Sequence, residues 1–385
     1  MRIGIPKETK NHEYRVALTP PSIAELVSHE HQVIVEKNAG ASIGFTDKDY
    51  VQAGAKVEKD PQKLFEGSDL IVKVKEPSTQ ELSWLGPEQT IFSYLHLAAL
   101  PKTTSALIKS GATAIAFETI TDAAGRLPLL APMSEIAGRL SVQVGAHALE
   151  MAGGGRGVLL GGAPGVLPAN VVIIGGGMAG ENAAQMAMGL GADVTMLDIN
   201  PNRLRTLQAN YGSRLKTLHS SKQNIETELK RADLVIGAVL ITGAASPKLI
   251  TRKHIRAMKT GAVIVDIGID QGGLSETSRP TTHAEPTYVV DGVIHYCVTN
   301  MPGAVARTSS DALNNALLPY VTKLADMGIE NALRIDAGLR AGLNVYRGAV
   351  THKAVAQALG KRFKSPAKAL GRAEIAEITK VNEVA

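Results

Sequence analysis

The sequence predicts a two-domain α/β protein in which one doubly wound domain is inserted into a second, discontinuous α/β domain of flavodoxin- or Rossmann-like type. Three observations support this fold class. The chain has 385 residues, which is more than one domain usually holds. Two series of short apolar strands alternate with helical segments, and the C-terminal part is mainly helical. We expect residues 1–128 and 308–385 to form one domain and residues 129–307 to form the other.

The first series of strands begins at the N-terminus. A helix is expected over Ser22–Ser28, because Thr19 is suited to cap a helix that has proline at its first position. Helical patterns separate apolar runs of strand length, and this alternation predicts a largely parallel sheet. The expected strands are Arg2–Ile5, Gln32–Glu36, Asp69–Val74, Thr90–Leu95 and Ala112–Phe117.

A long helix and a second series of strands follow. The helix is expected to run from Pro132 to about Met151, with Ser134 as its N-cap, and its length suits a connector between domains. Six strands with helices between them fit a complete Rossmann-type fold. The expected strands are Val171–Ile174, Val194–Asp198, Lys216–His219, Leu234–Ala238, Ala262–Ile267 and Ile294–Val298. From Pro302 to about Gly360 the pattern is helical, and we expect these helices to pack on the first domain.

Composition and charge exclude several classes of protein. The formal net charge is +5, but basic residues are interleaved with acidic ones along the chain. No aromatic platform accompanies the basic run from Lys361 to Arg372, so we interpret it as a solvated tail and expect no nucleic-acid partner. The single cysteine, Cys297, excludes an intrachain disulfide and suits a reducing compartment.

Two segments bear on targeting and membranes. The N-terminus is charged within two residues and lacks the apolar core of a signal peptide. Residues 157–180 carry no charge, but their glycines and prolines are unsuited to a helix in lipid. We therefore interpret that stretch as a loop leading into a buried strand, and we expect a cytoplasmic protein with no membrane partner.

The most specific motif is a glycine turn with the spacing Gly175-x-Gly177-x-x-Gly180. It directly follows the apolar strand Val171–Ile174 and opens a helix near Glu181. The first glycine permits the tight turn, the second lets the backbone approach a pyrophosphate, and the third lets the helix lie close to the strand. The helix N-terminus adds free N–H groups. This context predicts a dinucleotide site.

The choice of dinucleotide depends on Asp198, which ends the second strand of this domain. An acid there accepts hydrogen bonds from ribose hydroxyls and repels a 2′-phosphate, which favours NAD over NADP. Arg203 and Arg205 follow closely and could soften that repulsion. A plain glycine-rich turn with Asp198 as an ordinary strand-end residue is the structural alternative.

Two later strands end in segments that we expect near the nicotinamide. One is Gly237–Leu240 and the other is Asp266–Asp270, which includes Ile267, Gly268 and Ile269. Strand carboxyl ends face the ligand crevice in open α/β sheets.

Three polar residues of the first domain occupy comparable positions. Arg15 lies in the loop after the expected strand Arg2–Ile5. Lys75 directly follows Asp69–Val74, and His96 directly follows Thr90–Leu95. Each alone has an ordinary explanation: a surface ion pair, a solvated lysine or a structural histidine. Together they suit hydride transfer on an α-amino or α-keto acid. Arg15 can bind the carboxylate, Lys75 can polarise the reacting carbon, and His96 with Asp270 can move protons.

Other kinds of chemistry lack their motifs. The sequence has no His-x-x-His or His-Glu-x-x-His metal motif, no Gly-x-Ser-x-Gly nucleophile motif and no P-loop. We expect no metal.

From Met1 to about Gly360 the chain closely resembles the alanine dehydrogenases. The matching stretches include IPKE at 5–8, EYRVALTP at 13–20, VKVKEP at 72–77, YLHLA at 94–98, PMSEIAGR at 132–139, LLGG at 159–162 and DLVIGAVL at 233–240, together with residues 266–273, 280–283 and 300–303. The resemblance implies reversible oxidative deamination of L-alanine to pyruvate and ammonium with NAD. It also implies a homohexamer of two-domain subunits whose cleft closes on the ligand.

The same resemblance implies roles for individual residues. Arg15 and Lys75 match substrate-binding residues, and His96 and Asp270 match acid–base residues. The matching cofactor contacts are Ser134, Gly175, Gly177, Met178, Ala179, Gly180, Asp198, Arg203, Ser220, Val239, Leu240, Arg279, Val298, Thr299, Asn300 and Met301. The departures from the family pattern are Gly268 in place of a common alanine, Thr242 in place of a common proline, and a longer tail from Lys361, to which we assign no role.

Three alternatives remain open. The nucleotide-binding subunit of proton-translocating transhydrogenase has a similar sequence but generally lacks the pair formed by Lys75 and His96. A dehydrogenase of another amino acid would keep the same chemical residues. A non-catalytic NAD-binding protein would keep the glycines and lose those residues, which is not the pattern seen here.

Overall fold

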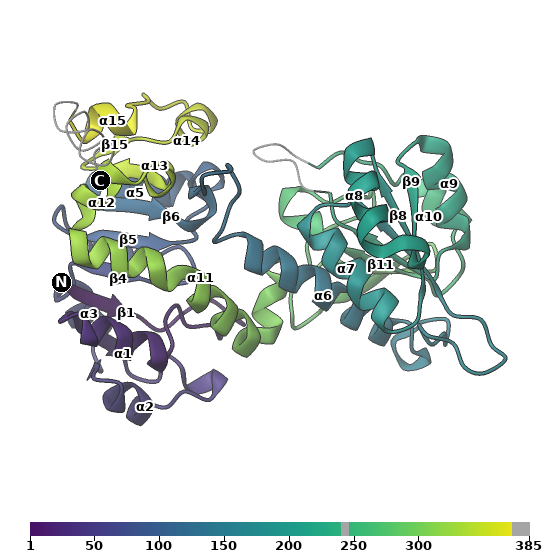
Figure 1. Cartoon of the computed structure of the whole chain (residues 1–385), viewed down its shortest axis with the longest axis horizontal. Coiled ribbons are helices and arrows are strands. Elements are labelled where there is room, and N and C mark those ends of the chain that lie inside the picture. Colours follow the sequence, from purple (N-terminus) through teal and green to yellow (C-terminus); the bar gives the residue numbers. More distant parts are fainter. Residues whose placement is uncertain (240–245, 372–385) are drawn as a thin grey trace. The chain divides into compact units, whose positions relative to one another are not determined.

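The computed structural model describes residues 1–239 and 246–371 (Figure 1). The chain divides into two compact units. Unit 1 comprises Met1–Pro132 and Val305–Ala385, and unit 2 comprises Met133–Ala304. Leu240 and Thr242, which the sequence analysis singled out, lie outside the described residues, as do positions 372–385 of the tail.

Unit 1 is built on an eight-stranded sheet within the described residues, in the order β15-β14-β6-β5-β4-β1-β2-β3. The neighbours from β6 to β3 pair in parallel, and β14 and β15 pair antiparallel. The strands are β1 (Arg2–Ile5), β2 (Gln32–Glu36), β3 (Lys56–Glu58), β4 (Leu70–Val72), β5 (Thr90–Ser93), β6 (Thr113–Ala116), β14 (Leu343–Tyr346) and β15 (Ala349–Val350). The strands β4, β5 and β6 are buried along their whole length, as expected where helices cover both faces.

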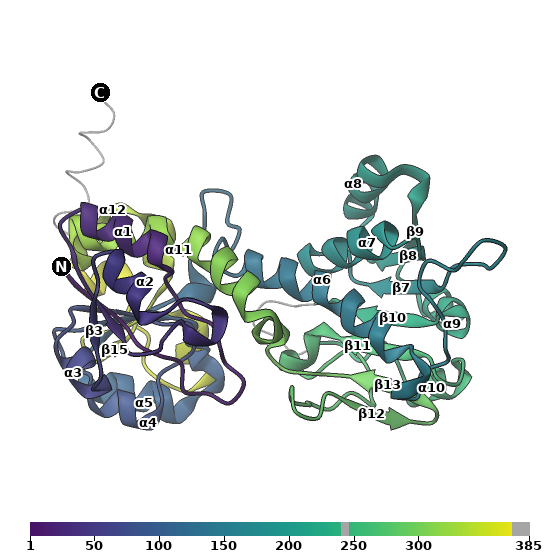
Figure 2. The ribbon, with the colours of Figure 1, turned by 90° about the horizontal axis from the view of Figure 1, so that it is seen from below.

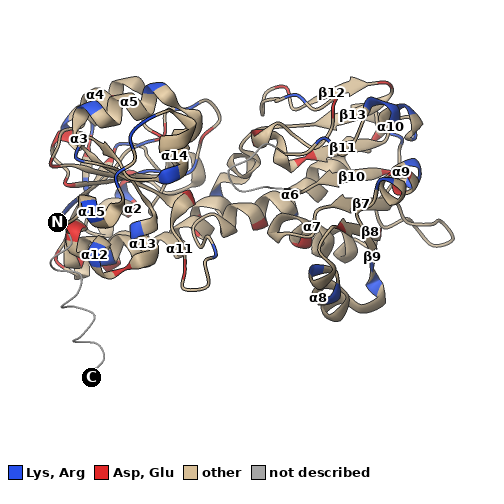
Figure 3. Ribbon diagram, turned by 90° about the horizontal axis from the view of Figure 1, so that it is seen from above, with Lys and Arg blue, Asp and Glu red and all other residues tan. Residues whose placement is uncertain are grey.

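Helices cover the two faces of this sheet. Figures 2 and 3 show α11 and α12 on one face and α4 and α5 on the other. The helices are α1 (Pro20–Ser28), α2 (Asp47–Gln52), α3 (Pro61–Glu66), α4 (Thr79–Ser83), α5 (Pro101–Ser110), α11 (Ala306–Met327), α12 (Ile329–Ile335), α13 (Ala337–Ala341), α14 (Lys353–Ala358) and α15 (Pro366–Ala369). The C-terminal helices therefore belong to the same unit as the N-terminal strands.

Unit 2 is a seven-stranded sheet within its described part, in the order β12-β13-β11-β10-β7-β8-β9. The strands are β7 (Asn170–Ile174), β8 (Asp193–Asp198), β9 (Leu215–His219), β10 (Leu234–Gly237), β11 (Val263–Asp266), β12 (Thr287–Val290) and β13 (Val293–Tyr296). The helices are α6 (Ala131–Ala148), α7 (Met178–Gly189), α8 (Pro201–Tyr211), α9 (Lys222–Arg231) and α10 (Arg252–Ala257). Figures 1 and 2 show α6 and α7 on the opposite face from α9 and α10. Two α/β sheets of this kind confirm the predicted fold class.

In both sheets the order in which successive strands are added reverses at an equivalent strand. In unit 1 the chain leaves β1 for β2 and β3 and then returns to place β4 on the other side of β1. In unit 2 it leaves β7 for β8 and β9 and returns to place β10 on the other side of β7. Ligands of open α/β sheets bind at such switch points, at the carboxyl ends of the strands. The fold therefore provides one candidate binding edge in each unit.

The prediction of an entirely helical segment between Pro302 and Gly360 is wrong, because β14 and β15 lie within it. They form a hairpin in which Tyr346 pairs with Ala349. The two residues of its turn have positive φ, 45° at Arg347 and 81° at Gly348. A turn of this kind matches the twist of paired strands. The apolar residues of β14 continue the sheet by pairing with β6.

Two further corrections concern helix starts and turns. The predicted N-cap at Ser134 is wrong, because α6 begins at Ala131 and Ser134 lies inside its first turn. Pro132, the second residue of α6, is tolerated there because the N–H group that proline lacks would have had no partner in the first turn. The strand β12 was not predicted, although the Asp291-Gly292 turn that joins it to β13 is a recognisable hairpin signal.

Candidate functional site

Arg15 lies in the loop after β1, where its guanidinium group is buried against Glu13. The Glu13 carboxylate accepts a hydrogen bond from Arg15 Nε at 2.7 Å and another from a terminal nitrogen at 2.5 Å. Burial alone would lower the pKa of Arg15, but the hydrogen bond and charge of Glu13 outweigh burial and raise it. The guanidinium is therefore a fixed, permanent cation at the carboxyl edge of the sheet.

A second group of buried charges anchors the turn that carries Lys75. Glu8 accepts hydrogen bonds from the backbone N–H of Val74 at 2.6 Å and of Lys75 at 3.2 Å. Lys73 Nζ lies 3.7 Å from Glu8 and donates to both carboxylate oxygens of Glu81, at 2.9 and 3.0 Å. These contacts hold the chain after β4, so the side chain of Lys75 starts from a fixed backbone.

Lys75 and Arg15 act on each other electrostatically. Burial lowers the pKa of the Lys75 amine, and the positive charge of Arg15 lowers it further. Two cations within electrostatic reach, one of them a lysine with a lowered pKa, favour binding of an anion such as a carboxylate.

His96 follows β5 and has an unusual backbone conformation. Its φ is 47° and its ψ is 38°, in the left-handed region, immediately before the short 3₁₀ helix Leu97–Ala99. Glu118 stabilises this turn by accepting hydrogen bonds from the backbone N–H of His96 at 2.7 Å and of Leu95 at 3.2 Å. The His96 side chain is 47% exposed, and its Nδ1 lies 3.9 Å from Glu118 Oε1. The imidazole is therefore accessible to solvent, on a turn whose left-handed backbone is uncommon for a residue other than glycine.

Tyr94 interacts with two of the three residues that the sequence predicts for the substrate, His96 and Arg15, and Arg15 interacts in turn with the third, Lys75. Its ring stacks on His96 with centroids 6.2 Å apart, and its phenol is within electrostatic reach of Arg15. The phenol donates to the carbonyl of Leu129 at 2.5 Å, and burial raises its pKa. Arg15, Lys75 and His96 thus lie in one neighbourhood of unit 1. Sequence reasoning missed Tyr94, although its alternation with His96 on one strand end was available as a signal.

In unit 2 the glycine turn has the geometry that its spacing predicts. Gly175 has a φ of 102°, and a Cβ there would lie 2.7 Å from the carbonyl oxygen of Ala238. A Cβ on Gly180 would lie only 1.9 Å from the carbonyl oxygen of Gly175. Around Gly177 there is open space, and this residue caps α7, which starts with Met178 and Ala179. The packed glycines close the turn, while the open one leaves room for a phosphate.

Asp198 ends β8 beside this turn. One carboxylate oxygen accepts the Gly176 N–H at 2.7 Å and the other accepts the Asn200 N–H at 2.7 Å. The Asp198 carbonyl accepts the N–H of Ser220 at 3.0 Å. Both Asp198 and Ser220 therefore lie at the carboxyl edge of the sheet.

The segment that carries Asp270 is a short 3₁₀ helix, Ile267–Gln271, with Asp270 exposed. Its anchor is the buried Asp266, which accepts the Leu274 N–H at 2.7 Å and the Ser278 hydroxyl at 2.5 Å. A Cβ on Gly268 would come within 2.9 Å of the Val239 carbonyl oxygen. Glycine at 268 therefore lets these two strand-end segments approach each other closely.

The remaining predicted cofactor residues occupy several positions of unit 2. Arg279 is exposed and lies over the Tyr288 ring at 4.1 Å. Val298 and Met301 are buried, Thr299 is half-buried, and Asn300 has a φ of 60°. Ser134 is in the first turn of α6, as described above.

The donor set of unit 2 suits a dinucleotide. An open glycine at a helix N-terminus supplies backbone N–H groups for phosphates, and the strand-end carboxylate of Asp198 supplies acceptors for ribose hydroxyls. Among residues 1–239 and 246–371, no group of three or more His, Cys, Asp or Glu side chains is arranged to hold a metal ion. Within the same ranges, no helix is long and apolar enough to cross a membrane.

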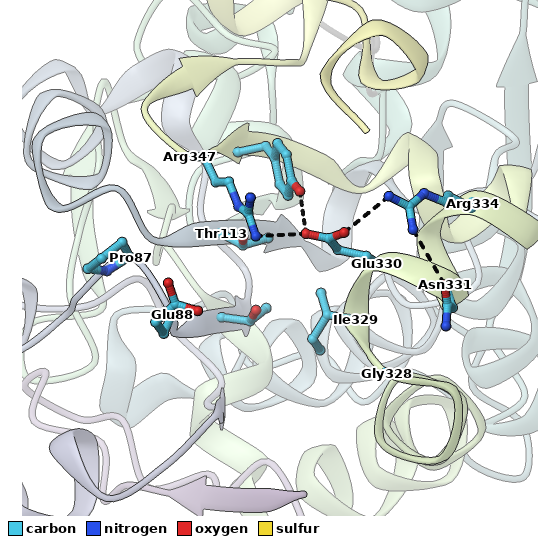
Figure 4. Close-up of a pocket in the computed structure, with 11 residues that line it drawn as sticks. Pro87, Glu88, Thr113, Gly328, Ile329, Glu330, Asn331, Arg334 and Arg347 are labelled. Carbon is cyan, nitrogen blue, oxygen red and sulfur yellow. Dashed lines mark hydrogen bonds and ion pairs between the residues drawn. The ribbon is translucent and has the colours of Figure 1, made fainter. Parts of the chain in front are cut away.

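A separate pocket of about 370 Å³ in unit 1 is lined by none of the predicted site residues (Figure 4). Glu330 lies at its centre, and its carboxylate accepts hydrogen bonds from Tyr346 at 2.6 Å, Arg347 at 2.9 Å and Arg334 at 3.1 Å. Arg334 also donates to the carbonyl of Leu370 at 3.0 Å. The charges of this pocket neutralise one another and tie the C-terminal segment to the sheet.

Two family models match the chain, and the second of them continues past the end of unit 2 into the C-terminal part of unit 1. Residues 4–137 match the family model described as "Alanine dehydrogenase/PNT, N-terminal domain". Residues 141–353 match the model described as "Alanine dehydrogenase/PNT, C-terminal domain".

Individual relatives cover nearly the whole chain. An alanine dehydrogenase of Halomonas elongata is 57% identical over 96% of this chain and 100% of the relative, and one of Mycolicibacterium smegmatis is 52% identical with the same coverage. A solved L-alanine dehydrogenase has a TM-score of 0.91 and 51% identity over 94% of this chain and 99% of that one. A transhydrogenase of Sinorhizobium meliloti has a TM-score of 0.79 and 25% identity over 92% and 100%.

Proposed function

The chain belongs to the alanine dehydrogenase/PNT family, and from this premise we propose that it is an alanine dehydrogenase that uses NAD to deaminate L-alanine reversibly to pyruvate and ammonium. The observation that carries this proposal is the neighbourhood of Arg15, Lys75 and His96 around Tyr94 in unit 1. A module that only exchanged hydride between nucleotides would need no such site. The lower identity to the transhydrogenase supports the same choice.

Arg15 and Lys75 bind the substrate in this proposal. A carboxylate suits a guanidinium group because the two planar groups can form parallel hydrogen bonds. Glu13 holds the Arg15 guanidinium in one orientation before the substrate arrives, so little ordering is left to pay at binding. The Lys75 ammonium, with its backbone held by Glu8, polarises the reacting carbonyl or stabilises the oxygen on that carbon.

His96 moves the protons. In the direction of deamination, water adds to the iminium carbon and the imidazole accepts a proton from that water. The imidazolium then gives this proton to the amino nitrogen, the C–N bond breaks to release ammonia, and the imidazole takes up the hydroxyl proton as the carbonyl forms. In the reverse direction His96 returns the proton as water is lost. Imidazole suits this task because it exchanges protons readily near neutral pH. We assign Asp270 an assisting and positioning role.

Unit 2 binds the nicotinamide dinucleotide. When bound, this cofactor accepts hydride from the α-carbon of alanine or returns it to the imino acid. Gly175 and Gly180 close the turn, and Gly177 leaves room for the pyrophosphate. Asp198 accepts hydrogen bonds from the ribose hydroxyls and repels a 2′-phosphate, and it therefore selects NAD over NADP.

We also propose that the protein works as a homohexamer in the cytoplasm. The similarity to alanine dehydrogenases over nearly the full chain supports the assembly, and the single buried cysteine suits a reducing compartment. Analytical ultracentrifugation tests the assembly: sedimentation of a hexamer supports it, and a monomer or dimer at micromolar concentration contradicts it.

The test of the activity is the loss of NADH absorbance with pyruvate and ammonium. Controls omit ammonium or replace NADH by NADPH. We expect oxidation of NADH that requires both pyruvate and ammonium, with alanine as product. Binding of NADH without turnover of pyruvate would contradict the proposal and favour another keto acid or transhydrogenase-like hydride exchange.

A further inference from the structure

We propose that Glu181 is a determinant of cofactor specificity, because it engages Arg203 and so withholds a cation from the 2′-phosphate of NADP. The inference rests on the proposed use of NAD in unit 2. It adds a residue that acts through another one, beside the acid at the end of β8.

Arg203 and Asp198 both contact Gly176 in the glycine turn. The N–H of Gly176 donates to Asp198 at 2.7 Å, and its carbonyl accepts from Arg203 Nε at 2.5 Å. Arg203 lies in the first turn of α8, which follows β8 directly. The guanidinium group is therefore close to the carboxylate that we expect at the adenosine ribose, where a cation would meet a 2′-phosphate.

Glu181 lies in the first turn of α7 and engages the same guanidinium from the other side. Its Oε2 forms a short ion pair with a terminal nitrogen of Arg203, and its Oε1 accepts the Tyr211 hydroxyl at 2.8 Å. Gln185 donates to the Tyr211 oxygen at 2.7 Å and so fixes the tyrosine. Burial would raise the pKa of Glu181, but the hydrogen bonds from Arg203 and Tyr211 outweigh it and lower the pKa. Glu181 is therefore a carboxylate at neutral pH.

The side chains of this pair are partly shielded, with 27% of Arg203 and 18% of Glu181 exposed. In this arrangement Asp198 repels a phosphate, and Arg203 offers no compensating charge because Glu181 neutralises it. The Arg205 guanidinium donates to Asn202 on its own helix at 2.6 Å, whereas Arg203 donates to the glycine turn itself. Removing the charge of Glu181 leaves Arg203 as a net cation beside the ribose site.

The experiment measures dissociation constants of NADH and NADPH by the fluorescence of the bound nucleotide, without substrate. We expect Glu181→Gln to bind NADPH more tightly and to lower the ratio of the NADPH constant to the NADH constant about tenfold, the size of one charge-assisted contact. In the double variant Glu181→Gln/Arg203→Gln the ratio should return toward that of the original protein. Glu226→Gln is the matched control, because Glu226 pairs with Lys230 on the surface of α9 in the same unit.

If Glu181 had only a structural role, Glu181→Gln would lower the melting temperature and weaken the binding of NADH and NADPH alike. An unchanged ratio in Glu181→Gln, or a changed ratio that persists without Arg203, overturns the inference. Failure of the original protein to bind either nucleotide would instead overturn the proposed function, so the two failures are distinguishable.

Discussion

The parallel strands of the two units follow the same order, but the two candidate sites are built from different chemical groups. In unit 2 the edge at the switch point is made of backbone: glycines without side chains, free N–H groups at the start of α7 and a single acid. In unit 1 the equivalent edge is made of charged side chains, several of which are buried and paired before any substrate arrives. A cofactor common to many enzymes can be held by backbone geometry, whereas a particular substrate needs particular charges.

From this difference we expect substitutions in unit 1 to impair binding and turnover of the substrate, and substitutions in unit 2 to impair binding of the nucleotide. The largest effect is expected for Arg15→Leu. It removes the partner of the substrate carboxylate and leaves Glu13 buried without its cation, which costs stability on the order of 3–5 kcal/mol. We expect kcat/KM for pyruvate to fall by about three orders of magnitude or more.

The double variant Glu13→Gln/Arg15→Leu separates the two consequences. Thermal unfolding should recover much of the lost stability, because no unpaired charge remains, while pyruvate turnover stays low. Recovery of turnover in the double variant would show that Arg15 serves only the fold.

His96→Ala should lower kcat by about 10²–10⁴-fold, the usual contribution of a general acid–base group. NADH affinity should change little, because His96 belongs to unit 1. His147→Ala is the control, since that histidine is exposed on α6 and pairs with Glu150 at 3.2 Å. Near-full turnover of His96→Ala at saturating pyruvate and ammonium would contradict its role.

Gly180→Ala tests the backbone-built site in unit 2. The new Cβ would lie 1.9 Å from the Gly175 carbonyl oxygen, so the turn must move and the NADH dissociation constant should rise at least about tenfold. Gly189→Ala is a matched control on the same helix, because a Cβ there meets nothing within 4 Å. Equal effects of the two substitutions on NADH titrations would exclude the glycine turn as the cause.

The smallest effect is a pH dependence in unit 1. Burial and the charge of Arg15 lower the pKa of Lys75, so this amine loses its proton at a lower pH than an ordinary lysine does. The charged form binds the substrate, and therefore KM for pyruvate should rise on the alkaline side before the ordinary lysine value of 10.5. Lys75→Arg keeps its charge, so its KM should stay flat over the same range. A rise of equal size in both proteins would assign the titration to another group.

The same contrast explains how much the sequence could predict. The glycine spacing after Val171–Ile174 predicts the turn in unit 2, because each glycine there answers a steric requirement set by the backbone alone. The alternation of apolar strands with helices predicts both sheets, because this pattern is also local in the sequence. The sequence predicts helix after Pro302 and misses β14. A strand of four residues carries no local signal of the distant strand with which it pairs.

The charged site of unit 1 could be predicted only in part. Strand ends indicate Arg15, Lys75 and His96, but the contacts that hold them join residues far apart in the chain. Glu8 supports Lys75 across more than sixty positions, and Glu118 supports the strained turn at His96 from the short 3₁₀ helix that follows β6. Such pairings depend on the folded topology, and a single sequence does not reveal which acid meets which cation.

Cross-titration of two variants with two ligands tests the central claim most directly. NADH would be titrated into Arg15→Gln and Asp198→Ala, and pyruvate would then be titrated into each protein at saturating NADH. We expect Arg15→Gln to lose pyruvate binding while it keeps NADH, and Asp198→Ala to lose NADH affinity while pyruvate still binds once the nucleotide site is filled. Equal loss of both ligands in either variant would contradict a division of labour between a charged substrate site in unit 1 and a backbone-built nucleotide site in unit 2.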